Sequence, residues 1–310
     1  MRIVCLAGGI GGARFLRGLK AAAPDADITV IGNTGDDITL FGLRVCPDLD
    51  TVMYTLGGGI NEDQGWGRAA ETFTVKEELA AYGMEPQWFG LGDRDVATHI
   101  VRTQMLSAGY TLAEVTQALC ARWQPGVRLI PMTNDRAETH VVVGEEHARR
   151  AIHFQEWWVR ERASIPAQEF AVIGADVAQP APGVLEAIAE ADLVIFPPSN
   201  PVVSIGTILQ VQGIREALNP KTVVGVSPII GRAPVRGMAD ACLTAIGVET
   251  TAQAVLELYG TPLINGWLVA EEDKGVALDG VTVEAVPLLM STPDTTRALA
   301  EATLSLALRA

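Results

Sequence analysis

A cluster of glycines follows the first apolar run of the chain, where a strand would end. Residues 8–12 read Gly-Gly-Ile-Gly-Gly. Glycines there let the backbone approach a phosphate, and the N-terminus of the following helix attracts an anion. The dinucleotide pattern fails, because Arg14 stands in place of its third glycine. The segment predicts phosphate or nucleotide contact, and the alternative is a tight turn that binds nothing. The predicted contacts are Gly8, Gly9, Gly11 and Gly12.

Four carboxylates follow the second predicted strand, which covers residues 27–32. Asp36 and Asp37 stand close behind it, and Asp48 and Asp50 lie in the segment Pro-Asp-Leu-Asp-Thr. Ligands of open α/β sheets bind at the carboxyl ends of the strands, and Mg²⁺ prefers carboxylate oxygens. We predict a Mg²⁺ site within this set, with turns and helix caps as the alternative. Spacing leaves open which two acids ligate.

Two loops after later apolar strands carry hydroxyl and amide side chains. Residues 197–206 follow the run 193–196, and residues 227–232 follow the run 222–226. Such groups at a strand end suit a phosphate or a base, and rigid connections are the alternative. Beside the glycines, these loops would line one cleft. The candidate nucleotide contacts there are Asn33, Ser199, Asn200, Ser204 and Ser227.

Two smaller segments carry charged side chains. Asp95 lies four residues before His99 and could cap a helix that carries it. Arg136 follows a predicted strand and could pair with a carboxylate or a phosphate. Solvated turns are the alternative for both segments.

Composition excludes several classes of partner. The chain has 310 residues, 48% of them hydrophobic, and a formal net charge of -14. Because an acidic surface repels polyanions, neither nucleic acid nor an anionic membrane is an expected partner. The four cysteines form no CxxC pair, which indicates a reducing, cytoplasmic compartment. The glycine-rich start predicts no signal peptide, and no apolar run is long enough to span a membrane.

The order of apolar segments predicts the fold class. A strand over 2–7, a helix over 13–22 and a strand over 27–32 open a Rossmann-like, doubly wound α/β fold with a mostly parallel sheet. We expect one domain over 1–310, with a helical insertion over 65–125 that covers the active-site cleft. The remaining expectations are loop over 33–68, strands over 127–130, 138–143 and 150–158, and helices over 184–191, 207–218 and 237–259.

Eight motifs occur in a fixed order. They are GGIGGARFL, NTGDD, CPDLDT, GWG, LGDRDVATH, HFQEWW, PSNPVVSIG and SPIIG. Together they resemble the 2-phospho-L-lactate transferase family of coenzyme F-420 biosynthesis, in its actinobacterial-type branch, over residues 1 to about 270.

The resemblance implies a substrate pair and a cofactor. The donor would be a guanosine diphospho-linked three-carbon acid, and the acceptor the ribityl hydroxyl of the deazaflavin Fo. GMP would be released, Mg²⁺ required, and the protein a homodimer. Asp50 and Gly90 match positions that contact Fo in the family, although many relatives carry a long basic residue where Gly90 stands.

These readings combine into one mechanistic hypothesis. The Fo hydroxyl attacks the phosphorus that bears the acid, GMP leaves, and Asp36 and Asp50 act as catalytic residues that hold Mg²⁺. The helical insertion and residues 132–136 would cover the deazaflavin. The full set of expected Fo contacts is Asp50, Thr51, Gly90, Asp93, Asp95, His99, Met132, Thr133, Asn134 and Arg136.

Two other functions compete with this one. A non-catalytic, nucleotide-sugar-binding regulator of a related family would share the glycine-rich start and the SNP loop. It would lack the PDLDT, GWG and LGDRD motifs that this chain has. A nicotinamide-dependent oxidoreductase is disfavoured by Arg14. The sequence does not distinguish phosphoenolpyruvate, phospholactate and phosphoglycerate.

Overall fold

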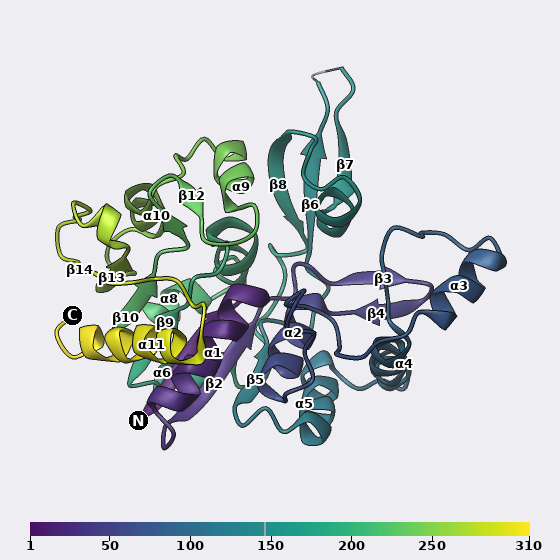
Figure 1. The fold of residues 1–310 in the computed structure, drawn as a ribbon, viewed down its shortest axis with the longest axis horizontal. Coiled ribbons are helices and arrows are strands. Elements are labelled where there is room, and N and C mark those ends of the chain that lie inside the picture. The colour runs from purple at the N-terminus through teal and green to yellow at the C-terminus, as the bar shows by residue number, and fades with distance from the viewer. Residues whose placement is uncertain (146) are drawn as a thin grey trace.

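A seven-stranded sheet forms the centre of the protein (Figure 1). The computed structural model describes residues 1–145 and 147–310. Every strand pairing in this sheet is parallel, which confirms the predicted α/β, Rossmann-like class. The strand order is β14-β13-β10-β9-β1-β2-β5. The bounds are β1 (Arg2–Ala7), β2 (Asp27–Gly32), β5 (Arg128–Pro131), β9 (Leu193–Phe196), β10 (Val223–Val226), β13 (Gly266–Val269) and β14 (Thr282–Ala285).

Helices cover both faces of the sheet because alternate residues of its strands point in opposite directions. Ile3 and Cys5 of β1 join one buried cluster, and Val4 and Leu6 join the other. The first cluster includes side chains of α1 (Ile10–Ala22), α2 (Pro47–Leu56), α5 (Leu112–Trp123) and α11 (Pro293–Ala307). The second includes those of α6 (Val184–Glu190), α8 (Ile214–Leu218), α9 (Ala239–Ala245) and α10 (Ala252–Tyr259).

The strand order reverses direction at β1. This strand pairs with β2 on one side and with β9 on the other. In open α/β sheets, the crevice outside the carboxyl ends of two such strands is where ligands bind. The loops that begin at Gly8 and at Pro197 therefore meet at this crevice.

Three smaller units flank the sheet (Figure 1). A hairpin consists of β3 (Ile38–Leu40) and β4 (Leu43–Val45). Near it lie α3 (Thr74–Ala81), which has no buried residue, and α4 (Asp93–Ser107). A three-stranded antiparallel sheet, in the order β7-β6-β8, stands out from the body. Its bounds are β6 (Glu138–Val143), β7 (Arg150–His153) and β8 (Ala167–Ile173).

Several predicted elements were wrong. Residues 33–68 were predicted as loop, but they contain β3, β4 and α2. The predicted strand over 150–158 ends at His153 and gives way to a π-helical segment, η1 (Glu156–Arg160). The predicted helix over 207–218 is broken into α7 (Gly206–Ile208) and α8, with Gly213 at a positive φ of 79° between them. Asp95 does not cap α4, which is preceded by Gly92.

Shorter elements complete the chain. They are η2 (Pro201–Ile205), β11 (Ile229–Ile230), β12 (Ala233–Pro234) and η3 (Glu271–Asp273). Within the described residues, no helix has the length and apolar character that crossing a membrane requires.

Candidate active site

The four glycines after β1 allow other segments to pack closely against the backbone. A Cβ on Gly8 would lie 2.6 Å from Cβ of Ser204, and one on Gly9 would lie 2.5 Å from a carboxylate oxygen of Asp48. A Cβ on Gly11 would meet the carbonyl of Pro198, and one on Gly12 would lie 3.0 Å from Oγ of Ser199. Close packing of α2 and of the loop after β9 therefore accounts for these glycines. The predicted residues Gly8, Gly9, Gly11, Gly12, Ser199 and Ser204 lie together.

Asn33, directly after β2, joins three segments at the crevice. Its Nδ2 donates to Asp36 Oδ1 at 3.1 Å, to Asp48 Oδ2 at 2.9 Å and to the carbonyl of Val203 at 3.2 Å. Its Oδ1 accepts from the backbone of Gly35 at 2.9 Å. One buried amide thus fixes two carboxylates between the glycine loop and η2.

Asp36 and Asp48 are acidic groups without a positive partner among the described residues. Both side chains are buried, and neither forms an ion pair within the described residues. Burial, and then the charge of Asp48, raise the pKa of Asp36 well above its usual range. Burial raises the pKa of Asp48 to about 7, against the hydrogen bonds from Asn33 and the backbone of Gly9. Two crowded carboxylates of this kind are stabilised by a shared proton or by a cation.

Asp37 differs from its neighbour Asp36 because it has a positive partner. Arg44 donates to it at 3.0 Å and also to Glu138 at 3.0 Å. Burial raises the pKa of Asp37 to about 6, and Arg44 and the thiol of Cys46 oppose this rise. The charge of Asp37 is therefore used inside the protein, where it joins the hairpin β3–β4 to β6.

A second cluster consists of Asp50 and Tyr54 from α2 and Asp95, His99 and Arg102 from α4. Arg102 forms a buried ion pair with Asp50 Oδ1. Tyr54 donates its hydroxyl to Asp95 at 2.7 Å. The other oxygen of Asp50, Oδ2, is buried without a hydrogen-bond partner among the described residues.

His99 lies between the two acids of this cluster. Because Arg102 Nη1 can only donate, the His99 Nδ1 that lies 3.0 Å from it accepts, which places the proton on Nε2. Nε2 lies 3.4 Å from Asp95 Oδ2. Burial would raise the pKa of Asp95, but the contacts with His99 and Tyr54 hold it below its usual value.

Asp50, Asp95 and His99 also have the spacing of a metal site. One ligand atom from each lies within 4.8 Å of the others. However, a divalent cation there would stand beside the buried guanidinium of Arg102, and like charges at such distances repel. Asp36 and Asp48 have no such neighbour, so they fit a cation better.

Sequence and structure comparisons relate this chain to a known family. A family model described as 2-phospho-L-lactate transferase CofD matches residues 3–285. The phosphoenolpyruvate transferase of Thermobifida fusca (strain YX) is 71% identical over 316 residues, which cover 99% of this chain and 98% of that protein. The phosphoenolpyruvate transferase of Streptomyces griseus is 69% identical over 313 residues, with the same coverage.

The chain belongs to the 2-phospho-L-lactate transferase family. It is therefore a transferase, as the motifs predicted, and the predicted actinobacterial-type branch is confirmed. Two solved structures of protein BH3568 from Bacillus halodurans share its fold. One has a TM-score of 0.64 at 18% identity and covers 98% of this chain and 99% of its own. The other, described as a member of the UPF0052 family, has a TM-score of 0.63 at 19% identity, with coverage of 97% and 99%.

Some residues predicted to contact substrates in this transferase form hydrogen bonds within the protein. Asp93 accepts from the backbone of Thr74 and Val75, and so caps α3. Asn134 accepts from the backbone of Ala113 at the start of α5. Asn200 accepts from two amides at the start of η2, and Ser227 exchanges hydrogen bonds with Ile229 inside its own turn.

The other predicted Fo contacts are Thr51, Gly90, Met132, Thr133 and Arg136. Met132 and Thr133 are wholly buried, and the Thr133 hydroxyl donates to the carbonyl of Gln179. Arg136 is paired with Glu138, and Thr51 is buried in α2. Gly90 is exposed, and a Cβ there would lie 3.8 Å from Nζ of Lys76, so α3 places an ammonium group beside this position.

Sequence reasoning missed Tyr54, Asp48 as the partner of Asp36, and Arg102. A signal existed for two of them. Asp50 and Tyr54 are four residues apart, and Asp95, His99 and Arg102 follow the spacing of one helical face. The signal was hidden because residues 47–56 were predicted to be loop.

The packing of the glycine loop gives a test by stability. We expect Gly8→Ala to lower the free energy of unfolding by about 1–3 kcal/mol, because its Cβ overlaps the side chain of Ser204. The double variant Gly8→Ala/Ser204→Gly should regain part of that loss in a urea titration. An unchanged midpoint in Gly8→Ala would contradict the observed contact.

Proposed function

We propose that this transferase moves a phosphorylated three-carbon acid, of the phosphoenolpyruvate or 2-phospholactate type, from a guanosine diphosphate-linked donor to the ribityl hydroxyl of Fo. The reaction releases GMP and forms the first phosphodiester-bearing form of coenzyme F-420. The observation that carries the proposal is the carboxylate pair Asp36–Asp48 beside the N-terminus of α1, in a chain with relatives named phosphoenolpyruvate transferase.

The N-terminus of α1 would bind the donor's phosphates. Among the described residues no side chain caps this helix, and its first turn contains no acid, so its amides can meet an anion. Ser199 adds a buried hydroxyl that has no partner among the described residues. Asn33 donates to the carbonyl of Val203 and so holds η2 beside these donors.

Asp50 would accept the proton of the attacking hydroxyl. Arg102 holds one of its oxygens and leaves Oδ2 unpartnered, as a proton acceptor requires. The hydroxyl oxygen forms a bond to the phosphorus that bears the acid, and the bond from that phosphorus to the GMP oxygen breaks. The electron pair leaves with GMP.

Mg²⁺ is the proposed cofactor, and Asp36 and Asp48 would hold it. The sequence had suggested Asp36 with Asp50. The structure gives Asp36 and Asp48 a common partner in Asn33, whereas Asp50 is paired with Arg102. When bound, the ion would neutralise charge on the diphosphate.

Mg²⁺ binding should depend on pH. Because folding raises the pKa of Asp36 and Asp48, the folded metal-free protein holds these protons more tightly than the unfolded chain. Its stability from these groups therefore falls as pH rises from about 4 to about 7. Mg²⁺ needs the deprotonated pair, so it should raise the Tm by several degrees at pH 8 and by less than about one degree at pH 5.5.

Matched variants make the Mg²⁺ test specific. Asp48→Asn should lose the Mg²⁺-dependent shift, and Asp279→Asn, at an exposed acid far along the chain, should keep it. An equal Mg²⁺-dependent shift of the Tm in Asp48→Asn and in the wild type would show that the cation binds elsewhere.

The activity itself is tested by mixing the purified protein with Fo, Mg²⁺ and each guanosine diphospho-linked acid. Chromatography should show Fo consumed and GMP formed with one donor above the others. If no donor reacts while GDP still stabilises the fold, the proposal fails and a nucleotide-binding regulator replaces it. We also propose that the protein is a cytoplasmic homodimer, as in the family. Light scattering of the purified protein tests the oligomeric state.

A further inference from the structure

Two arginines near the glycine loop have no carboxylate partner. Arg14 of α1 donates to the carbonyl of Met290 at 3.4 Å, and Arg236 donates to the carbonyl of Gln64 at 2.8 Å. Neither forms an ion pair within residues 1–145 and 147–310. The chain has 37 acidic and 23 basic residues, so carboxylates are in excess.

The two side chains lie close to each other and to the start of α1. Burial, and then the charge of Arg14, lower the pKa of Arg236, so the charge of Arg14 acts on the Arg236 guanidinium. A Cβ on Gly65 would lie 3.1 Å both from Nη2 of Arg236 and from Cγ2 of Ile10, the first residue of α1. Arg14 stands one helical turn after Ile10. The pair therefore flanks the helix N-terminus.

The nearest acid does not satisfy this pair. Glu62 feels the charge of Arg14, but it is held by two hydrogen bonds from Arg17. Arg14 and Arg236 repel each other in the free protein, and an anion between them would relieve that repulsion. Arginine also offers paired donors that match phosphate and carboxylate oxygens.

The segment 64–67 positions Arg236. The carbonyl of Gln64 accepts its hydrogen bond, and Gly65, at a positive φ of 81°, leaves room for its guanidinium. This gives the GWG motif, which the site described above does not use, a physical role.

We propose that Arg14 and Arg236 form an anion site that binds the donor of the transferase, through its diphosphate or through the carboxylate of its three-carbon acid. The identity of the donor rests on the proposed function, whereas the anion site rests on the two arginines alone. No residue of the carboxylate pair or of the Asp50 cluster takes part in it.

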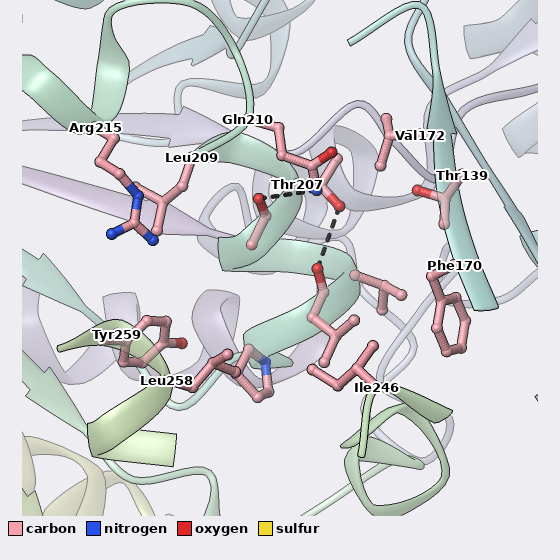
Figure 2. A pocket seen from close by; sticks show the side chains of 14 residues that line it. Thr139, Phe170, Val172, Thr207, Leu209, Gln210, Arg215, Ile246, Leu258 and Tyr259 are labelled. Atoms are coloured by element: carbon pink, nitrogen blue, oxygen red, sulfur yellow. Dashed lines mark hydrogen bonds between the residues drawn. The ribbon is translucent and has the colours of Figure 1, made fainter. Parts of the chain in front are cut away.

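Calorimetric titration of the full-length protein tests the site with inorganic pyrophosphate and with GDP. Arg14→Gln and Arg236→Gln should each weaken pyrophosphate binding about tenfold or more, because each removes a charge-assisted contact. The control is Arg215→Gln. Among the described residues Arg215 also has no ion pair, but it is exposed at a cavity of about 230 Å³ between β8 and α10 (Figure 2). This control should bind like the wild type.

Two further measurements separate the anion sources. If the pair binds the diphosphate, both variants should weaken GDP more than GMP. If it binds the carboxylate, GDP affinity should stay constant while KM for the complete donor rises about tenfold or more at similar kcat.

The outcomes also separate this site from the proposed reaction. Wild-type pyrophosphate binding and wild-type donor KM in Arg14→Gln/Arg236→Gln would overturn the anion site and leave the reaction standing. Arginine-dependent pyrophosphate binding without any Fo turnover would keep the anion site and refute the reaction.

Discussion

Replacing Asp36 by Asn should lower kcat/KM for the complete donor by two to three orders of magnitude, on the order of losses seen when charge stabilisation is removed from an active site. The free energy of unfolding should stay unchanged or rise. The reason is that burial and Asp48 both disfavour the charge of Asp36, so an amide removes a repulsion. Asn33 can still hydrogen-bond to the amide oxygen.

The adjacent acid supplies the matched control. Asp37→Asn takes away one partner of Arg44, a guanidinium that cannot shed its charge, and leaves it with Glu138 alone. Burial raises the pKa of Asp37, so its charge alone is costly. The same charge stabilises the guanidinium of Arg44, and the variant loses that stabilisation. We expect a loss of about 1–3 kcal/mol in stability. Greater loss of activity in Asp37→Asn than in Asp36→Asn would reverse our assignment of the two acids.

Arg102→Met should be the most destabilising of these changes. It removes the cation from a fully buried ion pair and leaves the carboxylate of Asp50 without its main partner. Breaking such a pair from one side costs about 3–5 kcal/mol. The midpoint of a guanidinium chloride titration measures this loss directly.

A double-mutant cycle checks the cause. Asp50→Leu in the Arg102→Met background removes the stranded charge, so the double variant should be more stable than Arg102→Met alone. Additive losses would mean that the two side chains act independently, contrary to their contact. Neither variant should turn over Fo.

The strands around β1 were predictable because they are short and almost all of their residues are buried. The runs at 2–7, 27–32 and 193–196 are apolar, and each is followed by residues that break a strand. Helix α2 was not predicted, because its sequence lacks the pattern of an amphipathic helix. Eight of its ten residues are buried, including Asp48 and Asp50, so no polar face marks it, and Cys46 offers no side-chain cap.

The types of residue in the site were predictable, but the contacts between them were less so. Glycines, acids and hydroxyls at strand ends do meet at the crevice beside β1. Which acid meets which depends on side-chain contacts between segments far apart in the chain. The Asn33 amide and the Arg102 guanidinium decide those pairings, and local spacing does not show which distant acid each of them contacts.

The position of β1 between β2 and β9 has a consequence for synthesis of the protein on the ribosome. β2 follows β1 almost at once, but β9 begins at Leu193. At ~5–20 residues per second, one edge of β1 would wait on the order of ten seconds or more for its partner. An open apolar edge is where nascent chains associate wrongly. The carbonyl of Val203, which Asn33 needs, emerges later still, so the site is completed only after two thirds of the chain has been made.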